Sequence, residues 1–249
     1  MKQRSNSFFA HLYSISIGLA GIGILALMAS RLPWTLVGKP LAFFALLSLT
    51  IKRAGFHVAP SVTHSLVGVI DLAALLIFGP VAGGMVALFS GLVYLLLHAL
   101  RHQRDRWAET LETALFNAGL KALVSLVSGW LYTVAGGNDL QTAGPDDVLP
   151  LLILFISWFT LDHLGWVIRE GLRGGLHQTW AFLRAVWTTS LLVELFPLPA
   201  AVIIVFVYNQ GNWFVFLMLS AGIVAVAFVV RRLADAWQQV KRHLSEVAA

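Results

Sequence analysis

Cysteine is absent and charge is scarce in this chain of 249 residues. Without cysteine there can be no disulfide bond, no thiolate metal ligand and no cysteine nucleophile. Only 12% of the residues are charged, whereas an ordinary soluble domain has about 25%. With 58% hydrophobic residues and a mean hydropathy of +0.80, the composition excludes an ordinary soluble globular domain.

Motifs for nucleotide, metal and catalytic chemistry are also missing. No phosphate-binding loop occurs, and the paired glycines at 83–84, 136–137 and 174–175 lack a Rossmann context. Histidines and carboxylates do not have the spacings of helical metal sites, and no nucleophile–base set stands out. We therefore expect no enzyme activity, no cofactor and no metal site. The net charge of +5 lies in short loops between apolar runs, so we expect no nucleic-acid partner.

Long apolar runs are what the sequence does contain. A helix that crosses a bilayer needs about 20 apolar residues, and about eight runs fit. They predict an all-α polytopic bundle over residues 1–230 that lies in a lipid bilayer. The predicted spans are about 8–29, 36–51, 62–78, 80–99, 109–135, 149–168, 186–208 and 212–230. The segment 171–185 has one apolar face and is predicted to be a helix in the membrane interface.

Basic residues gather in alternate loops. They occur at 2–4, 52–53, 101–106, 169–173 and 231–232. The intervening loops carry Arg31 and the acidic stretch 139–147. Because lysine and arginine accumulate in cytoplasmic loops, this bias predicts that both termini are cytoplasmic. The chain is thus predicted to be a multi-pass protein of the bacterial inner membrane.

The turn between the third and fourth predicted spans has its own signature. Gly79 followed by Pro80 predicts a tight turn, because proline is favoured at the first position of a helix. Gly84, Ala87 and Gly91 then share one face of the fourth span. Small residues at this spacing let two helices approach closely, so we expect this face to serve packing.

The last span runs into a charged helical segment at 231–249. Apolar residues recur there at alternating steps of four and three, which is the rhythm of a parallel coiled coil. These residues are Leu233, Trp237, Val240, Leu244 and Val247. Two heptads are too short to be stable alone. The segment therefore predicts a cytoplasmic connector of a homodimer that leads to an output domain or partner protein.

Charged residues inside a span mark site candidates, because they are costly in hydrocarbon and face the bundle interior. The fifth span carries Asn117, Lys121 and Ser125 on one face, continued by Ser128 and Tyr132. Asp71 lies near the middle of the third span and is predicted to approach Lys121, since pairing offsets desolvation. Three roles are consistent with the pair: Lys121 binds a small acidic ligand, the charge pair acts as a switch, or the pair is a structural ion pair that holds two helices together.

Other intramembrane polar residues are Asp162, His163, Glu194 and His64. Each lies where it can reach water or a backbone group, and a lone histidine at such a depth is usually structural. The candidate ligand-binding set is Asn117, Lys121, Ser125, Asp71 and Asp162.

From Asp71 onward the order of features resembles a family of bacterial membrane sensor regions. These precede HD-GYP phosphodiesterase, GGDEF diguanylate cyclase or histidine kinase domains. The resemblance rests on "LAALLIFGPVAGGMVALFSGLVYLLL" (72–97), "LFNAGLKALVSLVSGWLY" (115–132) and "FPLPAAVIIVFVY" (196–208), followed by the exit helix. Such regions are similar to the substrate-binding subunits of energy-coupling-factor vitamin transporters, which implies a small-molecule pocket between helices. Asp162 stands where the family has asparagine.

Three functions are consistent with these features. The first is a membrane sensor that binds a ligand and moves the exit helices of a dimer. The second is a small-molecule transporter or its substrate-binding subunit, with the polar face of the fifth span as the binding surface. The third is a scaffold subunit in which every intramembrane charge is structural.

Overall fold

The computed structural model describes residues 2–59, 62–102, 107–137 and 145–247, which form mostly α-helix. The helices are α1 (Lys2–Ala29), α2 (Trp34–Arg53), α3 (Val67–Phe78), α4 (Pro80–His102), α5 (Trp107–Val134), α6 (Val148–Leu195), α7 (Pro197–Asn209) and α8 (Trp213–Val247), with a short 3-10 turn at Pro145–Asp147. Two short strands, β1 (Phe56–Ala59) and β2 (Val62–His64), form an antiparallel hairpin between α2 and α3.

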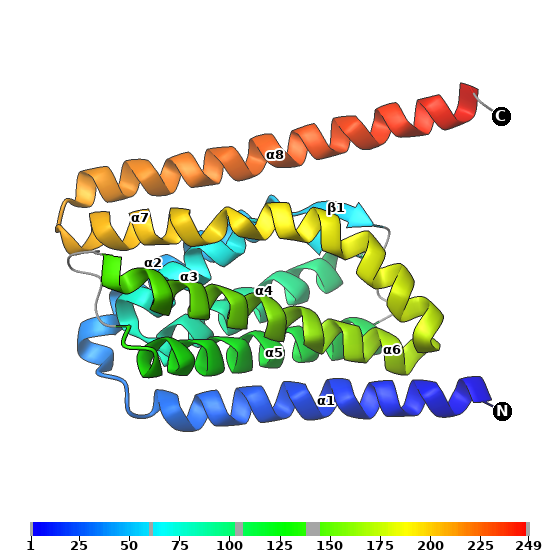
Figure 1. Cartoon of the computed structure of the whole chain (residues 1–249), viewed down its shortest axis with the longest axis horizontal. Coiled ribbons are helices and arrows are strands. Elements are labelled where there is room, and N and C mark those ends of the chain that lie inside the picture. The colour runs from blue at the N-terminus through cyan, green and yellow to red at the C-terminus, as the bar shows by residue number, and fades with distance from the viewer. Residues whose placement is uncertain (1, 60–61, 103–106, 138–144, 248–249) are drawn as a thin grey trace.

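The helices lie side by side as a bundle, and both termini lie at the same end of it (Figure 1). α5 occupies the middle and packs against α1, α4 and α6. α1 and α8 form opposite flanks of the bundle, and α8 runs toward the end at which α1 begins (Figure 1). This alternating arrangement places the ends of α2 and α4 and the starts of α1, α3 and α5 together at the end that holds the termini.

Five helices are long and apolar enough to cross a membrane. They cover Phe8–Ala29, Trp34–Arg53, Trp107–Val134, Pro145–Gly175 and Trp213–Val240. α3 (Val67–Phe78) and α7 (Pro197–Asn209) are apolar but shorter, and α4 is apolar over Pro80–Leu95. The predicted helical class is therefore confirmed in its coarse form, and the long apolar helices are consistent with the predicted membrane placement. The predicted start of the third span at residue 62 is wrong, because residues 62–64 pair with β1 and the helix begins at Val67.

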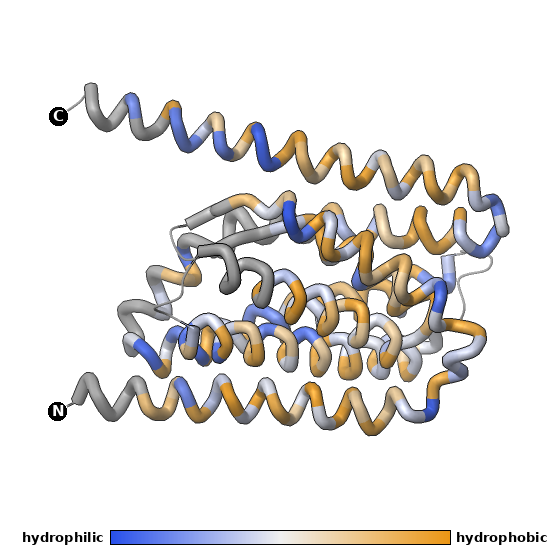
Figure 2. The backbone as a smooth tube through the Cα atoms, turned by 180° about the vertical axis from the view of Figure 1, so that it is seen from behind, coloured by the Kyte–Doolittle hydropathy of each residue, from blue (hydrophilic) through white to orange (hydrophobic). Residues whose placement is uncertain are grey.

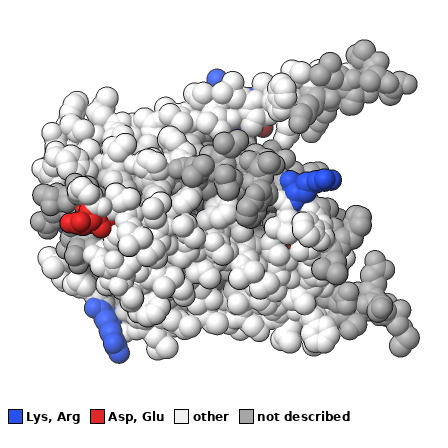
Figure 3. Space-filling model, viewed as in Figure 1, with Lys and Arg blue, Asp and Glu red and all other residues white. Residues whose placement is uncertain are grey.

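Large apolar side chains cover the outside of the bundle as well as filling its core. Phenylalanine, leucine and tryptophan side chains are exposed along α1, α5, α6 and α8, whereas several polar side chains are buried. The buried polar residues are Ser14, Ser48, Asp71, Ser90, Ser125, Ser128, Asp162, Arg169 and Ser220. Apolar residues dominate the tube in Figure 2, and the face in Figure 3 presents few charged atoms. An apolar surface around an apolar core that also encloses a few polar side chains is what a lipid environment favours.

Glycines set two features of the architecture. Gly79 has a φ of +90° and ends α3, and Pro80 starts α4 directly after it, so the predicted tight turn is confirmed. Gly175 has a φ of +70° and interrupts α6. The chain reverses there, and the part of α6 after Gly175 continues with α7 toward the opposite end (Figure 1). The predicted interfacial helix, 171–185, thus includes this reversal.

Small residues bring helices into backbone contact, as predicted for α4. A Cβ at Gly84 would lie 3.0 Å from Leu25 and 3.5 Å from the Ser125 Cβ, so this face of α4 packs on α1 and α5. A second close crossing joins α1 to α5, where a Cβ at Gly21 would lie 2.1 Å from the Gly119 carbonyl oxygen. The sequence reading had not identified this contact.

Aromatic rings join α2, α3, α7 and α8 at the end opposite the termini. Phe44 stacks on Phe216 with ring centroids 5.8 Å apart, and Tyr208 lies 5.5 Å from Phe78 and 5.4 Å from Phe216. Such pairs each contribute about 0.5–1.5 kcal/mol beyond the area they bury. This end of α8 is therefore fixed to the bundle.

Candidate functional site

Four charged side chains from four helices act on one another inside the bundle. They are Lys52 on α2, Asp71 on α3, Lys121 on α5 and Asp162 on α6, and we call them the interior charge cluster. Two lysines and two aspartates give the cluster no formal net charge. A balanced set of this kind limits the cost of holding charge in an apolar environment.

Lys121 and Asp162 form the closest pair of the cluster. The Lys121 Nζ lies 2.8 Å from the Asp162 Oδ2, and both side chains are largely buried. The same Nζ lies 5.7 Å from the centre of the Trp158 ring, close enough for a cation–π interaction. The second carboxylate oxygen of Asp162, Oδ1, is buried and has no hydrogen-bond partner among the described residues. Among the described residues, one oxygen of this buried carboxylate is therefore an acceptor without a donor.

Asp71 has different neighbours from those predicted. Its Oδ1 accepts a hydrogen bond from the Ser48 hydroxyl at 3.0 Å. The Ser48 and Ser90 hydroxyls are 3.0 Å apart, and the Lys52 Nζ donates to the Ser90 Oγ at 3.3 Å. Lys52, which the sequence reading had placed in a basic loop, thus reaches back into the bundle from the last turn of α2.

The predicted Asp71–Lys121 pair is corrected to a Lys121–Asp162 pair. Lys121 faces α6, whereas Asp71 faces α2, so similar depth along two helices did not imply contact. The charge of Lys121 still acts on Asp71, and both belong to the interior charge cluster.

Two of the remaining predicted site residues, Ser125 and Asn117, lie on the same face of α5 as Lys121 but have different roles. Ser125 is buried and donates its hydroxyl to the Pro80 carbonyl at 2.9 Å, which fixes the start of α4. Asn117 is half-buried one turn before Lys121. His163 is held by the Phe159 carbonyl at 2.9 Å and stacks on the Phe159 ring. The side chains of His64 and Glu194 lie outside the described residues.

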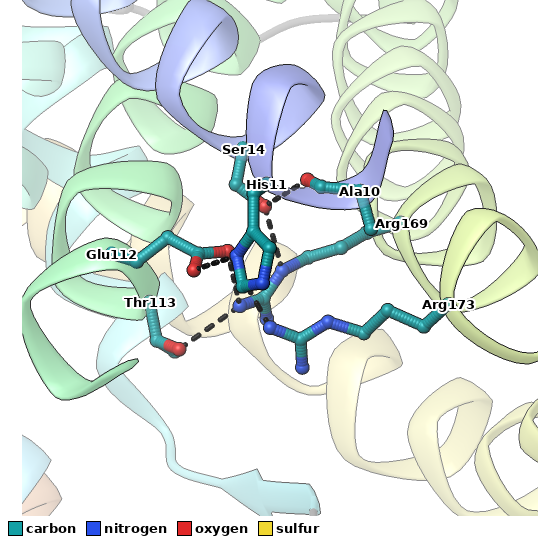
Figure 4. Close-up of polar contacts among 7 residues, drawn as sticks. All are labelled: Ala10, His11, Ser14, Glu112, Thr113, Arg169 and Arg173. Carbon is teal, nitrogen blue, oxygen red and sulfur yellow. Dashed lines mark hydrogen bonds and ion pairs between the residues drawn. The ribbon is translucent and has the colours of Figure 1, made fainter. Parts of the chain in front are cut away.

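A second polar cluster was missed by the sequence reading (Figure 4). Arg169 on α6 is 2% exposed, and its Nε donates to the Ser14 Oγ while its Nη2 donates to the Thr113 Oγ1, both at 3.0 Å. Its guanidinium also lies 5.0 Å from the Phe116 ring and 5.2 Å from the Trp166 ring. These contacts hold α1, α5 and α6 together.

Glu112 is the acid of this second cluster. Its Oε1 lies 3.6 Å from the Arg169 Nη2 and 3.5 Å from the Arg173 Nη2, and its Oε2 contacts the His11 Nδ1. We call His11, Ser14, Glu112, Thr113, Arg169 and Arg173 the Arg169 cluster. The sequence held one signal for it: Arg169 follows Asp162 by seven residues and therefore shares its helix face.

The exit helix is continuous from Trp213 to Val247. Leu233, Trp237 and Val240 are 65%, 61% and 48% exposed, so this stripe is largely solvent-accessible in a single chain. The side chain of Leu244 lies outside the described residues. Arg231 ties α8 to α2, because its Nη1 donates to the Arg53 carbonyl at 2.6 Å. Arg53 directly follows Lys52 of the interior charge cluster.

The described parts of the chain contain no group of three histidine, cysteine or carboxylate side chains that could hold a metal ion. The chain matches no protein-family model, and no curated protein and no solved structure is detectably similar to it.

Proposed function

We propose that this chain is a multi-pass membrane module that binds a small polar ligand at the interior charge cluster and passes a signal to the cytoplasm through α8. The observation that carries the proposal is the Asp162 carboxylate. One of its oxygens pairs with Lys121, and the other is buried without a partner among the described residues. An unsatisfied buried carboxylate oxygen costs free energy, which a ligand that donates a hydrogen bond would recover.

The binding chemistry follows from the neighbours of that oxygen. Asp162 Oδ1 favours a ligand with an N–H or O–H donor, and Lys121 favours an acceptor on the same ligand. The Trp158 ring supplies an apolar wall next to Lys121. A small molecule that carries both a donor and an acceptor suits this arrangement better than a simple anion.

The proposed placement in the membrane has eight crossings in the bacterial inner membrane, with both termini in the cytoplasm. The five long apolar helices support it, together with the basic residues at the end that holds the termini. The remaining crossings come from α3, α4 and α7. α3 lies inside the bundle, α4 follows it after the turn at Gly79, and α7 extends the part of α6 after Gly175 so that the two together make one crossing.

The proposed output is a change in α8 within a homodimer. The exposed stripe of Leu233, Trp237 and Val240 supplies the contact to the second copy. The helix that carries it connects the bundle to an output domain or partner protein. Arg231 supports coupling, since it joins α8 to the carbonyl of Arg53, next to Lys52. A ligand that binds two arrangements of α2 with different affinity would shift the population of α8 arrangements.

The first experiment asks whether the purified chain holds a small molecule. Native mass spectrometry of the full chain should detect a bound species that is lost in Asp162→Asn and Lys121→Met. Asp235→Asn is the matched control, because this carboxylate is exposed on α8. Absence of any bound species in the parent chain and in membrane extracts would count against the ligand site and favour a scaffold.

A second readout tests the output. Because the native chain has no cysteine, a single Val240→Cys reports α8 contacts through disulfide cross-linking in membranes. Asp162→Asn should change the cross-linking yield, and Arg231→Gln should remove that response while the bound molecule is retained. A bound molecule with an unresponsive α8 would instead favour the substrate-binding subunit of a transporter.

A further inference from the structure

We propose that a recess between α1, α5 and α6 binds the headgroup of an aminophospholipid, one that carries a phosphate and a primary ammonium as phosphatidylethanolamine does. The recess has a volume of about 670 Å³ and is lined by His11, Ile15, Ala108, Glu109, Glu112 and Arg173. It shares His11, Glu112 and Arg173 with the Arg169 cluster and contains none of the residues of the interior charge cluster. It is thus a second site, which takes from the proposed function only the placement in the membrane.

The lining presents both signs of charge. The Glu109 carboxylate accepts hydrogen bonds from an ammonium, and the Arg173 guanidinium donates to a phosphate. Glu112 and His11 also line the recess and are paired with each other through Oε2 and Nδ1. A simple anion would meet the two carboxylates, and a simple cation would meet the arginine. A headgroup that is itself zwitterionic matches this pattern at both ends.

Arg173 is the cation with capacity for another partner. Its side chain is 28% exposed, and its contact with Glu112 is 3.5 Å long. A guanidinium has five N–H donors, so this contact leaves others for a phosphate. Arg169 is instead buried and donates to Ser14 and Thr113, and it does not line the recess.

The depth of the recess agrees with the headgroup level. At about 1.5 Å per residue, His11 lies about 27 Å along α1 from Ala29, and Glu112 lies about 33 Å along α5 from Val134. The hydrocarbon core of a bilayer is about 30 Å thick. With the far ends of both helices at one membrane surface, the recess lies at the opposite surface, where headgroups are.

An apolar track leads away from the recess. Ile15 lines it and is exposed, and Leu12 and Leu19 are exposed at three and four residues on either side of Ile15. Residues at this spacing share one helix face. The face offers an acyl chain a path along α1 once the headgroup is seated, which a soluble headgroup analogue could not use.

The test measures which lipid the full chain retains. The protein is reconstituted in nanodiscs with equal mole fractions of phosphatidylethanolamine, phosphatidylcholine and phosphatidylglycerol, and retained lipid is counted by native mass spectrometry. We expect about tenfold preference for phosphatidylethanolamine over phosphatidylcholine, whose quaternary ammonium has no N–H donor; this ratio corresponds to about 1.4 kcal/mol. Glu109→Gln and Arg173→Gln should each abolish the preference. Arg173→Lys should keep it, because a lysine still binds phosphate.

Arg232→Gln is the matched control, since it removes an exposed arginine on α8 and should leave the preference unchanged. Equal retention of phosphatidylethanolamine and phosphatidylcholine would overturn the proposal, as would a preference for phosphatidylglycerol. If Arg232→Gln lost the phosphatidylethanolamine preference as fully as Arg173→Gln, the preference would depend on net charge alone, and the proposal would be overturned. Displacement of the retained lipid by soluble phosphoethanolamine would assign the recess to a soluble ligand instead. The small-molecule measurement at Asp162 is independent of all these results.

Discussion

Arg169 shows at the scale of one residue how this fold holds charge inside. Its guanidinium has a carboxylate, two hydroxyls and two aromatic rings as neighbours, from three helices. Removing one member of a buried, hydrogen-bonded set leaves the others unsatisfied in a medium that cannot solvate them. The arrangement therefore depends on Arg169 more than its single ion pair suggests.

We expect Arg169→Met to lower the free energy of unfolding by about 3–5 kcal/mol, the usual cost of removing one partner of a buried pair. Arg169→Lys should recover only part of this loss. The lysine keeps the positive charge, but its ammonium cannot reach the same set of acceptors. Thermal unfolding of the detergent-solubilised protein measures the difference. An unchanged midpoint in Arg169→Met, equal to that of Arg232→Gln, would contradict the role given to Arg169.

The sequence predicts which residues belong to the interior charge cluster better than it predicts which of them are in contact. Lys121, Asp71 and Asp162 stand out because charge is rare in apolar runs, and all three belong to the interior charge cluster. The partner of Lys121 could not be predicted, because depth along a helix leaves its rotation and its neighbours undetermined. Arg169 was interpreted as a loop residue since it follows the apolar run, although it is buried.

At the scale of the element, the crossing of α1 and α5 rests on missing side chains. A Cβ at Gly119 would lie 2.5 Å from the Gly18 Cα, and the groups in contact are backbone, which cannot move aside. The two helices thus touch through their main chains. Close approach of this kind strengthens dispersion contacts, which drive helix association in lipid.

Gly21→Ala should therefore destabilise the protein by about 1–3 kcal/mol or separate α1 from α5, because the added methyl overlaps the Gly119 carbonyl. Gly23→Ala is the matched control on the same helix, where a Cβ meets nothing within 4 Å. It should be neutral or stabilising, since alanine favours helix more than glycine by about 1 kcal/mol. Thermal unfolding of the two variants compares them directly; equal midpoints would show that the crossing is looser than described.

Elements were predicted well where one apolar run makes one helix, as at Phe8–Ala29 and Trp107–Val134. The prediction was wrong at residues 62–64, which were included at the start of the third span but pair with β1. Hydropathy reports that a segment avoids water, and it does not report whether its backbone bonds within a helix or to a neighbouring strand.

On the scale of the whole molecule, the proposed orientation is open to direct chemical labelling. The chain has no native cysteine, so single cysteines report without background. We expect Asp146→Cys to react with a membrane-impermeant maleimide in intact cells, and Asp235→Cys to react after the inner membrane is permeabilised. Labelling of both positions in intact cells would contradict the placement of the C-terminal helix in the cytoplasm.

The proposed homodimer makes a separate prediction. Leu233→Glu with Val240→Glu places charges in the exposed stripe of α8 and should abolish association of the cytoplasmic segments. Light scattering of the purified protein and cross-linking through α8 measure this loss. Asp235→Asn serves as the control for a change in charge beside the stripe, and a dimer that persists in the double variant would remove the coiled coil from the proposal.

The Arg169 cluster also limits the order in which contacts can form while the chain is being synthesised. The Arg169 Nε and the Ser14 Oγ are joined in the fold but separated by 155 residues of chain. At about 5–20 residues per second, the ribosome makes Arg169 roughly 8–30 s after Ser14. During that interval the first helix has neither its arginine nor, at the start, its glycine partner on α5. In the proposed membrane placement, this helix stays in the bilayer on its own apolar surface until the Arg169 contacts in Figure 4 can form.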